Sequence, residues 1–270
     1  MLCCGVVIVI FSQISSCAPK VKESREGEVV TYKDRRKRVI PYIIIGRGDT
    51  IYNGIAKYYY PNGKKSDEIS YVLNKKLGWQ SSYDTFGKLV RKTFYKNDIV
   101  DGFETFFNRK EQSDSEKFYV GGKLYFSKQY YANGQLKVFT AMNNSVPFYA
   151  VEFDSLGTKK FENGYAFSLN ESCFYPNIDQ TRVGQEMVIT IPIVAIPGYQ
   201  TTVRAAKFDS SGSMLGNTDS LPVFKYYAVY KTKFDKAGKY RIGLAGTLRN
   251  DKGELLRSDT LFTNIVILPR

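Results

Sequence analysis

The residue types that most often carry catalysis or bind metals are scarce in this chain of 270 residues. It contains no histidine, four cysteines, and 26 aspartate and glutamate residues. Without histidine there can be no Ser-His-Asp or Cys-His catalytic set and no His-ligated zinc or haem. Paired carboxylates suffice for glycoside cleavage, but no acidic pair stands out from the solvated background. We therefore predict no catalytic residue, metal site or cofactor, and a carboxylate-dependent glycan-active enzyme is the less favoured alternative.

One cysteine stands in a sequence context suited to covalent modification. The apolar stretch 5–11 is too short to span a bilayer and is followed by small and polar residues, the layout of an export signal. Ile14-Ser15-Ser16-Cys17 then resembles the lipobox of bacterial lipoproteins. The resemblance implies a signal peptide over residues 1–16, cleavage between Ser16 and Cys17, and acylation of Cys17 by groups such as palmitate. A plain secretory signal or a buried strand is the alternative.

The remaining cysteines and the residues after Cys17 extend this interpretation. Cys3 and Cys4 would leave with the signal peptide, so Cys173 is the one thiol left in the mature chain, and we expect it to be a small buried residue. Ala18-Pro19 lacks the aspartate that favours retention in the inner membrane. By the lipoprotein resemblance, the protein is expected at the outer membrane of a Gram-negative bacterium, facing the periplasm or the surface.

The net charge of +13 is spread along the chain rather than concentrated. Lysine and arginine outnumber aspartate and glutamate by 9 to 5 in residues 18–50, by 17 to 12 in 51–167, and by 13 to 9 in 168–270. This even distribution argues against a nucleic-acid partner. The basic run 35–38 is the exception, and we interpret residues 17–38 as a basic tether that is either solvated or in contact with anionic head groups.

The middle of the chain repeats with a period of 23 to 24 residues. Glycine-centred turns occur at Gly63, Gly87, Gly134 and Gly157, and a degenerate copy centred on Lys110 completes five units. An aromatic residue stands four positions before each turn centre: Tyr59, Tyr83, Phe106, Tyr130 and Phe153. Two short strands and two tight turns fill the period. The repeat predicts an elongated antiparallel sheet of stacked β-hairpins over residues 39–167, with Val39–Ile45 as a leading strand.

The repeat units resemble a known family. The first unit, from Gly54 through Tyr58-Tyr59-Tyr60 to Asn62-Gly63, looks like a MORN-type repeat, most like the variant in bacterial YwqK-family proteins, which are often labelled antitoxins. The resemblance covers residues 51–167, although Tyr125 and Phe148 replace the leading glycine in the last two units. It implies a binding or scaffolding surface, and an antitoxin or immunity-like inhibitor of a partner protein is the alternative.

The last hundred residues have a different sequence pattern. Beyond about Ser168 the repeat stops, and β-branched strands recur at longer spacing: Met187–Ile193, Thr201–Phe208, Val223–Phe234, Tyr240–Thr247 and Thr263–Leu268. This rhythm predicts a β-sandwich over residues 168–270. Residues 235–240 resemble the corner before strand F of immunoglobulin-like domains, which implies that the Tyr240 hydroxyl bonds back to the backbone.

The sequence thus predicts an all-β protein, with a sheet of stacked hairpin repeats followed by an immunoglobulin-like sandwich. We expect a non-catalytic envelope protein that is attached to the membrane by its lipid anchor and binds another envelope protein or a glycan. Aromatic ladders on sheets bind sugar rings or extended peptides. The candidate contact residues are therefore the five aromatic residues before the turns and the single tryptophan, Trp79, with plain packing of the sheet as the alternative.

Overall fold

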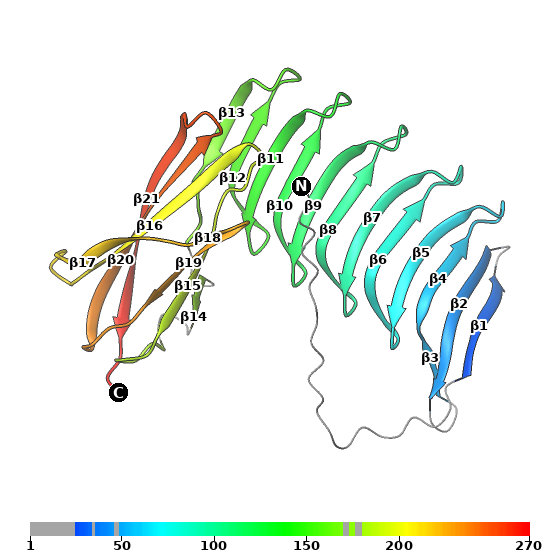
Figure 1. Ribbon diagram of the computed structural model, residues 1–270, viewed down its shortest axis with the longest axis horizontal. Coiled ribbons are helices and arrows are strands. Elements are labelled where there is room, and N and C mark those ends of the chain that lie inside the picture. The colour runs from blue at the N-terminus through cyan, green and yellow to red at the C-terminus, as the bar shows by residue number, and fades with distance from the viewer. Residues whose placement is uncertain (1–24, 34–35, 46–48, 170–172, 176–179) are drawn as a thin grey trace, which may run out of the picture.

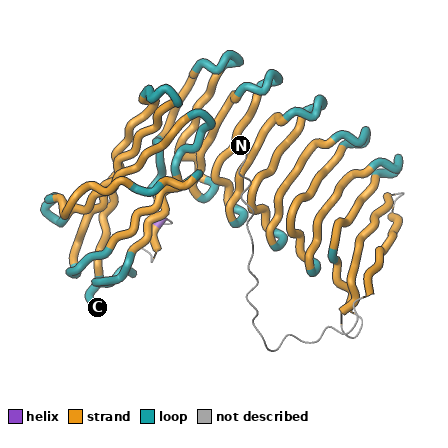
Figure 2. The backbone as a smooth tube through the Cα atoms, in the orientation of Figure 1, coloured by secondary structure: helices purple, strands orange, loops and turns teal. Residues whose placement is uncertain are grey.

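The computed structural model describes residues 25–33, 36–45, 49–169, 173–175 and 180–270, and these residues form strands and loops without an α-helix. Figure 1 shows a long curved sheet followed by two smaller sheets at its C-terminal end, and Figure 2 shows how the loops line both margins of the long sheet. The all-β prediction is confirmed. Within these residues, no helix has the length and apolar character needed to cross a membrane. The predicted signal peptide, Ser16 and Cys17 lie outside the described residues.

The long sheet contains thirteen strands that follow one another in chain order, with each strand antiparallel to its neighbours. Only β3 leaves this path, because it pairs with β2 beside β4. The strands are β1 (Arg25–Lys33), β2 (Arg36–Ile45), β3 (Asp49–Tyr52), β4 (Gly54–Tyr59), β5 (Lys65–Val72), β6 (Lys75–Tyr83), β7 (Leu89–Lys96), β8 (Ile99–Phe107), β9 (Ser113–Val120), β10 (Lys123–Tyr130), β11 (Leu136–Asn143), β12 (Val146–Phe153) and β13 (Lys159–Gly164). The predicted sheet of stacked hairpins is therefore present.

The predicted tether over residues 17–38 is wrong where the structure describes it. Strand β1 pairs with β2 from Arg25 opposite Ile44 to Lys33 opposite Arg36, so both strands belong to the sheet. The physical reason is that the first repeat hairpin would otherwise present an edge of unpaired backbone groups. The backbone of a polar segment can form hydrogen bonds with those groups, and β-branched residues such as Val29 and Val30 favour the strand conformation. The charged side chains of the segment do not prevent this pairing.

Both margins of the sheet are held by hydrogen bonds that recur with the repeat. At one margin, Tyr60 Oη donates to the Tyr83 carbonyl at 2.7 Å, and Tyr131 Oη donates to the Phe153 carbonyl at 3.1 Å. At the other margin, tight turns such as Asn97-Asp98 have two consecutive residues with positive φ, as a two-residue hairpin requires. Each hairpin is thereby fastened to the next by its own turn residues.

The degenerate third turn is centred on Glu111 rather than Lys110. Glu111 has φ of 59° and its N–H donates to the Asn108 carbonyl at 2.9 Å, just as Gly87 with φ of 84° donates to the Asp84 carbonyl. The aromatic residue equivalent to Tyr83 is therefore Phe107, and the prediction of Phe106 for this column is wrong. Since side chains alternate along a strand, a slip of one residue moves Phe106 to the opposite face.

The C-terminal region consists of two four-stranded sheets that enclose a common core, as predicted for a β-sandwich. One sheet has the order β14-β15-β19-β18 and the other has the order β17-β16-β20-β21. Their strands are β14 (Phe174–Tyr175), β15 (Met187–Pro192), β16 (Tyr199–Phe208), β17 (Met214–Ser220), β18 (Val223–Phe224), β19 (Tyr227–Thr232), β20 (Gly238–Asn250) and β21 (Leu255–Ile267). Tyr240 Oη donates to the Lys236 carbonyl at 3.0 Å, which confirms the hydrogen bond expected of that corner.

The sandwich shares its core with the last hairpins of the long sheet. We call the side of the long sheet that carries Trp79, Phe103, Phe126 and Tyr149 the ladder face. At β11 and β12 the residues of this face are buried together with apolar residues of the sandwich, among them Met187, Ile189, Ile191, Ala228 and Leu244. The two parts therefore form one continuous core, and the sandwich covers only the C-terminal end of the ladder face (Figure 1).

A hydrogen-bonded ion pair closes this junction at the surface. The Ala166 N–H donates to Asp259 Oδ2 at 2.7 Å, and Arg257 Nε lies 2.9 Å from the same oxygen. The side chain of Asp259 is nearly buried. This carboxylate therefore ties the segment that leaves the repeat sheet to strand β21 of the sandwich.

Candidate binding site

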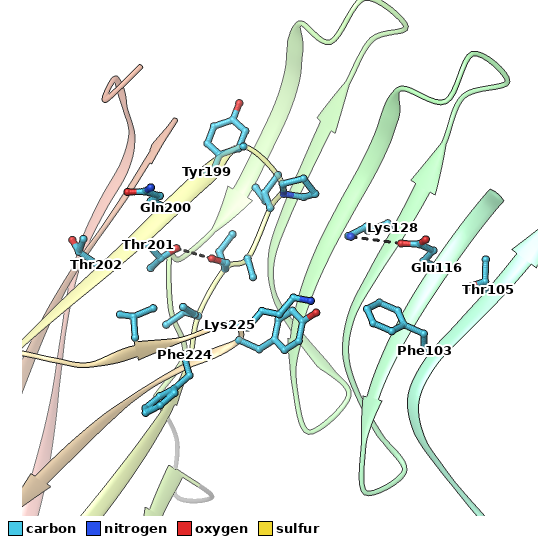
Figure 3. A pocket seen from close by; sticks show the side chains of 18 of the residues that line it. Phe103, Thr105, Glu116, Lys128, Tyr199, Gln200, Thr201, Thr202, Phe224 and Lys225 are labelled. Carbon is cyan, nitrogen blue, oxygen red and sulfur yellow. Dashed lines mark hydrogen bonds and ion pairs between the residues drawn. The ribbon is translucent and has the colours of Figure 1, made fainter. Parts of the chain in front are cut away.

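A cleft of about 1020 Å³ lies where the sandwich stops covering the ladder face. One wall is the ladder face itself, represented by Trp79, Lys92, Phe103, Thr105, Glu116 and Lys128. The other wall consists of residues 193–202, which lead into β16, and residues 223–226 around β18. Figure 3 shows Phe103 and Lys225 approaching each other from the two walls. Repeat sheet and sandwich are thus both needed to form the cleft.

The ladder-face wall forms the floor of the cleft and contains two rings from one column of the repeat, Trp79 and Phe103. Eight residues before each turn centre stand Ile55, Trp79, Phe103, Phe126 and Tyr149. The exposed fraction falls along this column from 56% at Ile55 and 41% at Trp79 to 3% at Phe126 and 1% at Tyr149. The row of rings therefore begins in solvent and ends in the core beneath the sandwich.

Neighbouring strands add rings to this row. The centroids of Trp79 and Phe94 are 5.1 Å apart, those of Phe103 and Phe118 are 4.9 Å apart, and the Phe118 ring lies 4.5 Å from that of Tyr226, which comes from the sandwich. Such distances are typical of favourable ring contacts. The rings thus support one another, and the exposed ones are held in fixed orientations.

Lysine ammonium groups lie over the exposed Trp79 ring and over the half-buried rings of Phe103 and Tyr226. Lys92 Nζ lies 4.6 Å from the Trp79 ring centroid, and Lys225 Nζ lies 5.8 Å from that of Phe103 and 5.1 Å from that of Tyr226. These are cation–π distances. The exposed floor therefore combines flat apolar surface with ammonium groups.

The one carboxylate of the cleft is already engaged. Glu116 Oε2 accepts a hydrogen bond from Tyr130 Oη at 2.8 Å and lies 3.6 Å from Lys128 Nζ. Burial, together with the bond to Glu116, raises the pKa of Tyr130 well above its ordinary value, so this phenol stays protonated and donating. Within the described residues, no cluster of histidine, cysteine, aspartate and glutamate has the arrangement to hold a metal ion. The groups of this cleft are suited to stacking and ion pairing.

Of the residues predicted from sequence, Trp79 is the one that lines the cleft. Tyr83 and Tyr130 lie on the ladder face outside it, where their hydroxyls donate to Glu68 and Glu116. Tyr59 has Lys37 Nζ 5.5 Å from its ring. Phe153 is buried in the shared core and supports packing rather than binding.

Phe106 lies on the opposite face, with Lys117 Nζ 5.3 Å from its ring. The column that contributes Trp79 and Phe103 to the floor stands eight residues before each turn. Its members Ile55, Trp79, Phe103, Phe126 and Tyr149 can be found in the sequence once the third turn is centred on Glu111. Cys173 is buried, as expected, with Asn143 Nδ2 3.7 Å from its sulfur.

Comparisons with known proteins agree with the repeat. Residues 52–72 and 78–97 match the family model of the MORN repeat variant. These segments contain β4 with β5 and most of β6 with β7, so these two hairpins are MORN-type repeats. No curated protein matches the chain.

Two solved structures show partial similarity. One is S. aureus TarM, a point mutant in complex with Fondaparinux, alpha-GlcNAc-glycerol and UDP, with 19% identity and a TM-score of 0.28 over 35% of this chain. The other is TarM, with 19% identity and a TM-score of 0.27 over 40% of this chain. The matches span 19% and 20% of the length of those two chains.

Proposed function

We propose that this protein is a non-catalytic, lipid-anchored protein of the bacterial cell envelope that binds another protein or a glycan in the cleft between its repeat sheet and its sandwich. The observation that carries the proposal is the aromatic row that runs out of the shared core into the open cleft. MORN-type repeats serve mainly as binding or scaffolding surfaces, which supports this role. The repeat sheet and the sandwich are then both required for binding, because each supplies one wall of the site.

The exposed ring of Trp79 is the reason to favour binding over plain packing. Trp79 is 41% exposed, although the same column is buried four strands further along, at Phe126. Ring surface left in solvent forfeits the free energy that burial would give, roughly 25 cal/mol per Å² of apolar area. Exposed apolar surface bordered by polar residues marks interaction sites more often than chance.

The state of the polar groups supports a role without catalysis. An acid–base mechanism needs a side chain free to exchange protons with a substrate. Glu116 is held between Lys128 and Tyr130, and the remaining charged residues of the cleft are lysines. Stacking on the rings and pairing with the lysines are what this set of residues offers.

The lipid anchor rests on the sequence around Cys17. Radiolabelled palmitate should enter the full chain, and Cys17→Ala should abolish labelling and release the protein from membranes into the soluble fraction. Label retained by the variant would contradict the anchor and leave the cleft proposal untouched.

Photo-crosslinking in intact cells tests the cleft directly. A photoreactive amino acid at Thr105 lies in the cleft, whereas one at Gln129, exposed on the opposite face, is the matched control. We expect adducts from position 105 and few from position 129. Equal adduct yields from both positions, or none from position 105, would contradict binding in the cleft.

A further inference from the structure

We infer that the ligand of this cleft is an acidic glycan chain, whose sugar rings stack on Trp79 and Phe103 and whose anionic groups pair with Lys92 and Lys225. The inference rests on the proposed binding function and names the chemistry of its ligand. It is carried by a juxtaposition that occurs twice in the cleft, namely an aromatic ring with an ammonium group over it, and the ring is exposed at Trp79 and half-buried at Phe103.

The two pairs are built from different parts of the chain. In the first, Trp79 of β6 has Lys92 Nζ of the neighbouring strand 4.6 Å from its ring. In the second, Phe103 of β8 has Lys225 Nζ, from the segment between β18 and β19, 5.8 Å from its ring. A sugar with a carboxylate or sulfate has the complementary shape, because its apolar ring face and its anionic group lie side by side.

The spacing of the rings suits a chain that lies across the strands. Trp79 and Phe103 occupy equivalent positions on strands two apart, which separates them by roughly 9.6 Å. A stiff polymer of six-membered rings can place alternate units on such platforms. Thr105, Gln200 and Thr202 border the same cleft with groups that can hydrogen-bond to sugar hydroxyls.

The charge of the cleft selects an anion. Its lining contains Lys92, Lys128 and Lys225 against Glu116, a net charge of three minus one, or two positive. Glu116 is paired with Lys128. Among the described residues, neither Lys92 nor Lys225 has a carboxylate within ion-pair distance, so both are available to a ligand. An unbalanced positive cleft attracts and concentrates anionic partners.

The same geometry disfavours two other anionic partners. A nucleic-acid strand presents a charge about every 3.4 Å, whereas Lys92 on β7 and Lys128 on β10 are three strands, or roughly 14 Å, apart. An extended peptide binds a sheet by adding hydrogen bonds at an edge. The cleft lies over the middle of a sheet whose backbone groups already pair between strands.

Affinity electrophoresis of the detergent-solubilised full chain tests the inference. The probes are polygalacturonate and chondroitin sulfate as acidic glycans, pullulan as a neutral glycan, polyglutamate as an acidic peptide, and single-stranded DNA. We expect retardation by at least one acidic glycan, weakened by NaCl, and none by the other three probes. Stronger retardation by pullulan, polyglutamate or DNA, or none by either acidic glycan, would overturn the inference.

Matched variants locate the site. Trp79→Ala should weaken binding about fivefold and Lys92→Gln about threefold. The controls Phe86→Ala and Lys96→Gln change an exposed aromatic residue and an exposed lysine outside the cleft and should leave binding unchanged. Equal losses in test and control variants would overturn the assignment. If neither acidic glycan retards the protein while crosslinks from position 105 persist, the inferred ligand class is wrong. The proposed binding function would still stand in that case.

Discussion

The N-terminal and C-terminal hairpins of the repeat sheet share a backbone but differ in what covers their ladder face. Where β4 carries Lys57, the equivalent position of β12 is Val151, which is fully buried, and where β7 carries Lys92, β11 carries the fully buried Phe139. The turns and their hydrogen bonds are nevertheless the same at both ends. The turns and their hydrogen bonds at the two margins thus hold the hairpins together at both ends of the sheet, whereas the side chains on the ladder face differ between the ends. The cleft lies where the two kinds of surface meet.

The largest expected effect comes from removing a ring at the covered end. Phe139→Ala should lower the free energy of unfolding by roughly 3–5 kcal/mol, because it leaves a cavity in the shared core. Its equivalent at the uncovered end, Lys92→Ala, should change stability by less than about 0.5 kcal/mol. Guanidinium denaturation of both variants measures the contrast. Similar losses would show that the two ends are not energetically distinct.

The junction between the two regions gives the next effect. Asp259→Ala leaves the Ala166 N–H and the Arg257 guanidinium without their carboxylate partner. A nearly buried donor without a partner costs about 2 kcal/mol. Denaturation should show this loss, and hydrogen exchange should be faster around residue 166 than at β4 and β5. Uniformly faster exchange along the whole chain would contradict a local role.

Substitutions at two equivalent turn centres, Gly87 and Glu111, should change stability by smaller amounts and in opposite directions. Gly87→Ala puts a side chain at φ of 84° and should destabilise by about 1 kcal/mol. Glu111→Gly relieves the same strain at φ of 59° and should stabilise by a similar amount, reduced by loss of the 3.2 Å bond from the Leu89 N–H. Thermal unfolding distinguishes the signs. A loss of stability in Glu111→Gly would mean that this bond outweighs the backbone strain.

The smallest effect is a pH dependence on the face opposite the ladder face, where Tyr119 Oη donates to Glu104. Burial, and then the charge of Glu104, raises the pKa of Tyr119 to about 12. Below pH 10 the phenol is neutral in the folded and unfolded chain, so its contribution is fully present. Between about pH 10 and 12 the unfolded chain ionises first, so stability falls as pH rises. In Tyr119→Phe, the guanidinium midpoint should fall less steeply between about pH 10 and 12 than in the unchanged protein. An unchanged dependence of the midpoint on pH would contradict this role of Tyr119.

Much of the fold was readable because it depends on local chemistry. Short-range sequence patterns reveal the repeat period and the turns at Gly63, Gly87, Gly134 and Gly157. They also reveal the end of the repeat near residue 168, where more widely spaced β-branched strands begin. The sandwich strands were placed well where β-branched residues alternate, as in β15 and β16. Strand β17 (Met214–Ser220) was missed because all seven of its residues are exposed and carry no apolar alternation.

The wrong assignment of Phe106 and the missed second wall of the cleft have different physical reasons. A glycine-free turn left the third centre ambiguous by one residue, and in a strand one residue exchanges the two faces. Phe106 was therefore assigned to a column that belongs to Phe107. The partner wall, residues 193–202, lies more than a hundred positions from Trp79 along the chain, and no local pattern links them.

The sequence by itself determined the repeat, the all-β architecture, the absence of any imidazole chemistry and the aromatic content of the columns, because these depend on residue types and their spacing. Only the tertiary structure decided which part of the ladder face is covered. The ladder face has the same backbone along its length, and whether a ring on it is core or binding surface depends on how far the sandwich reaches. The boundary of that contact turns Trp79 and Phe103 into the floor of a cleft while Phe126 and Tyr149 remain in the core.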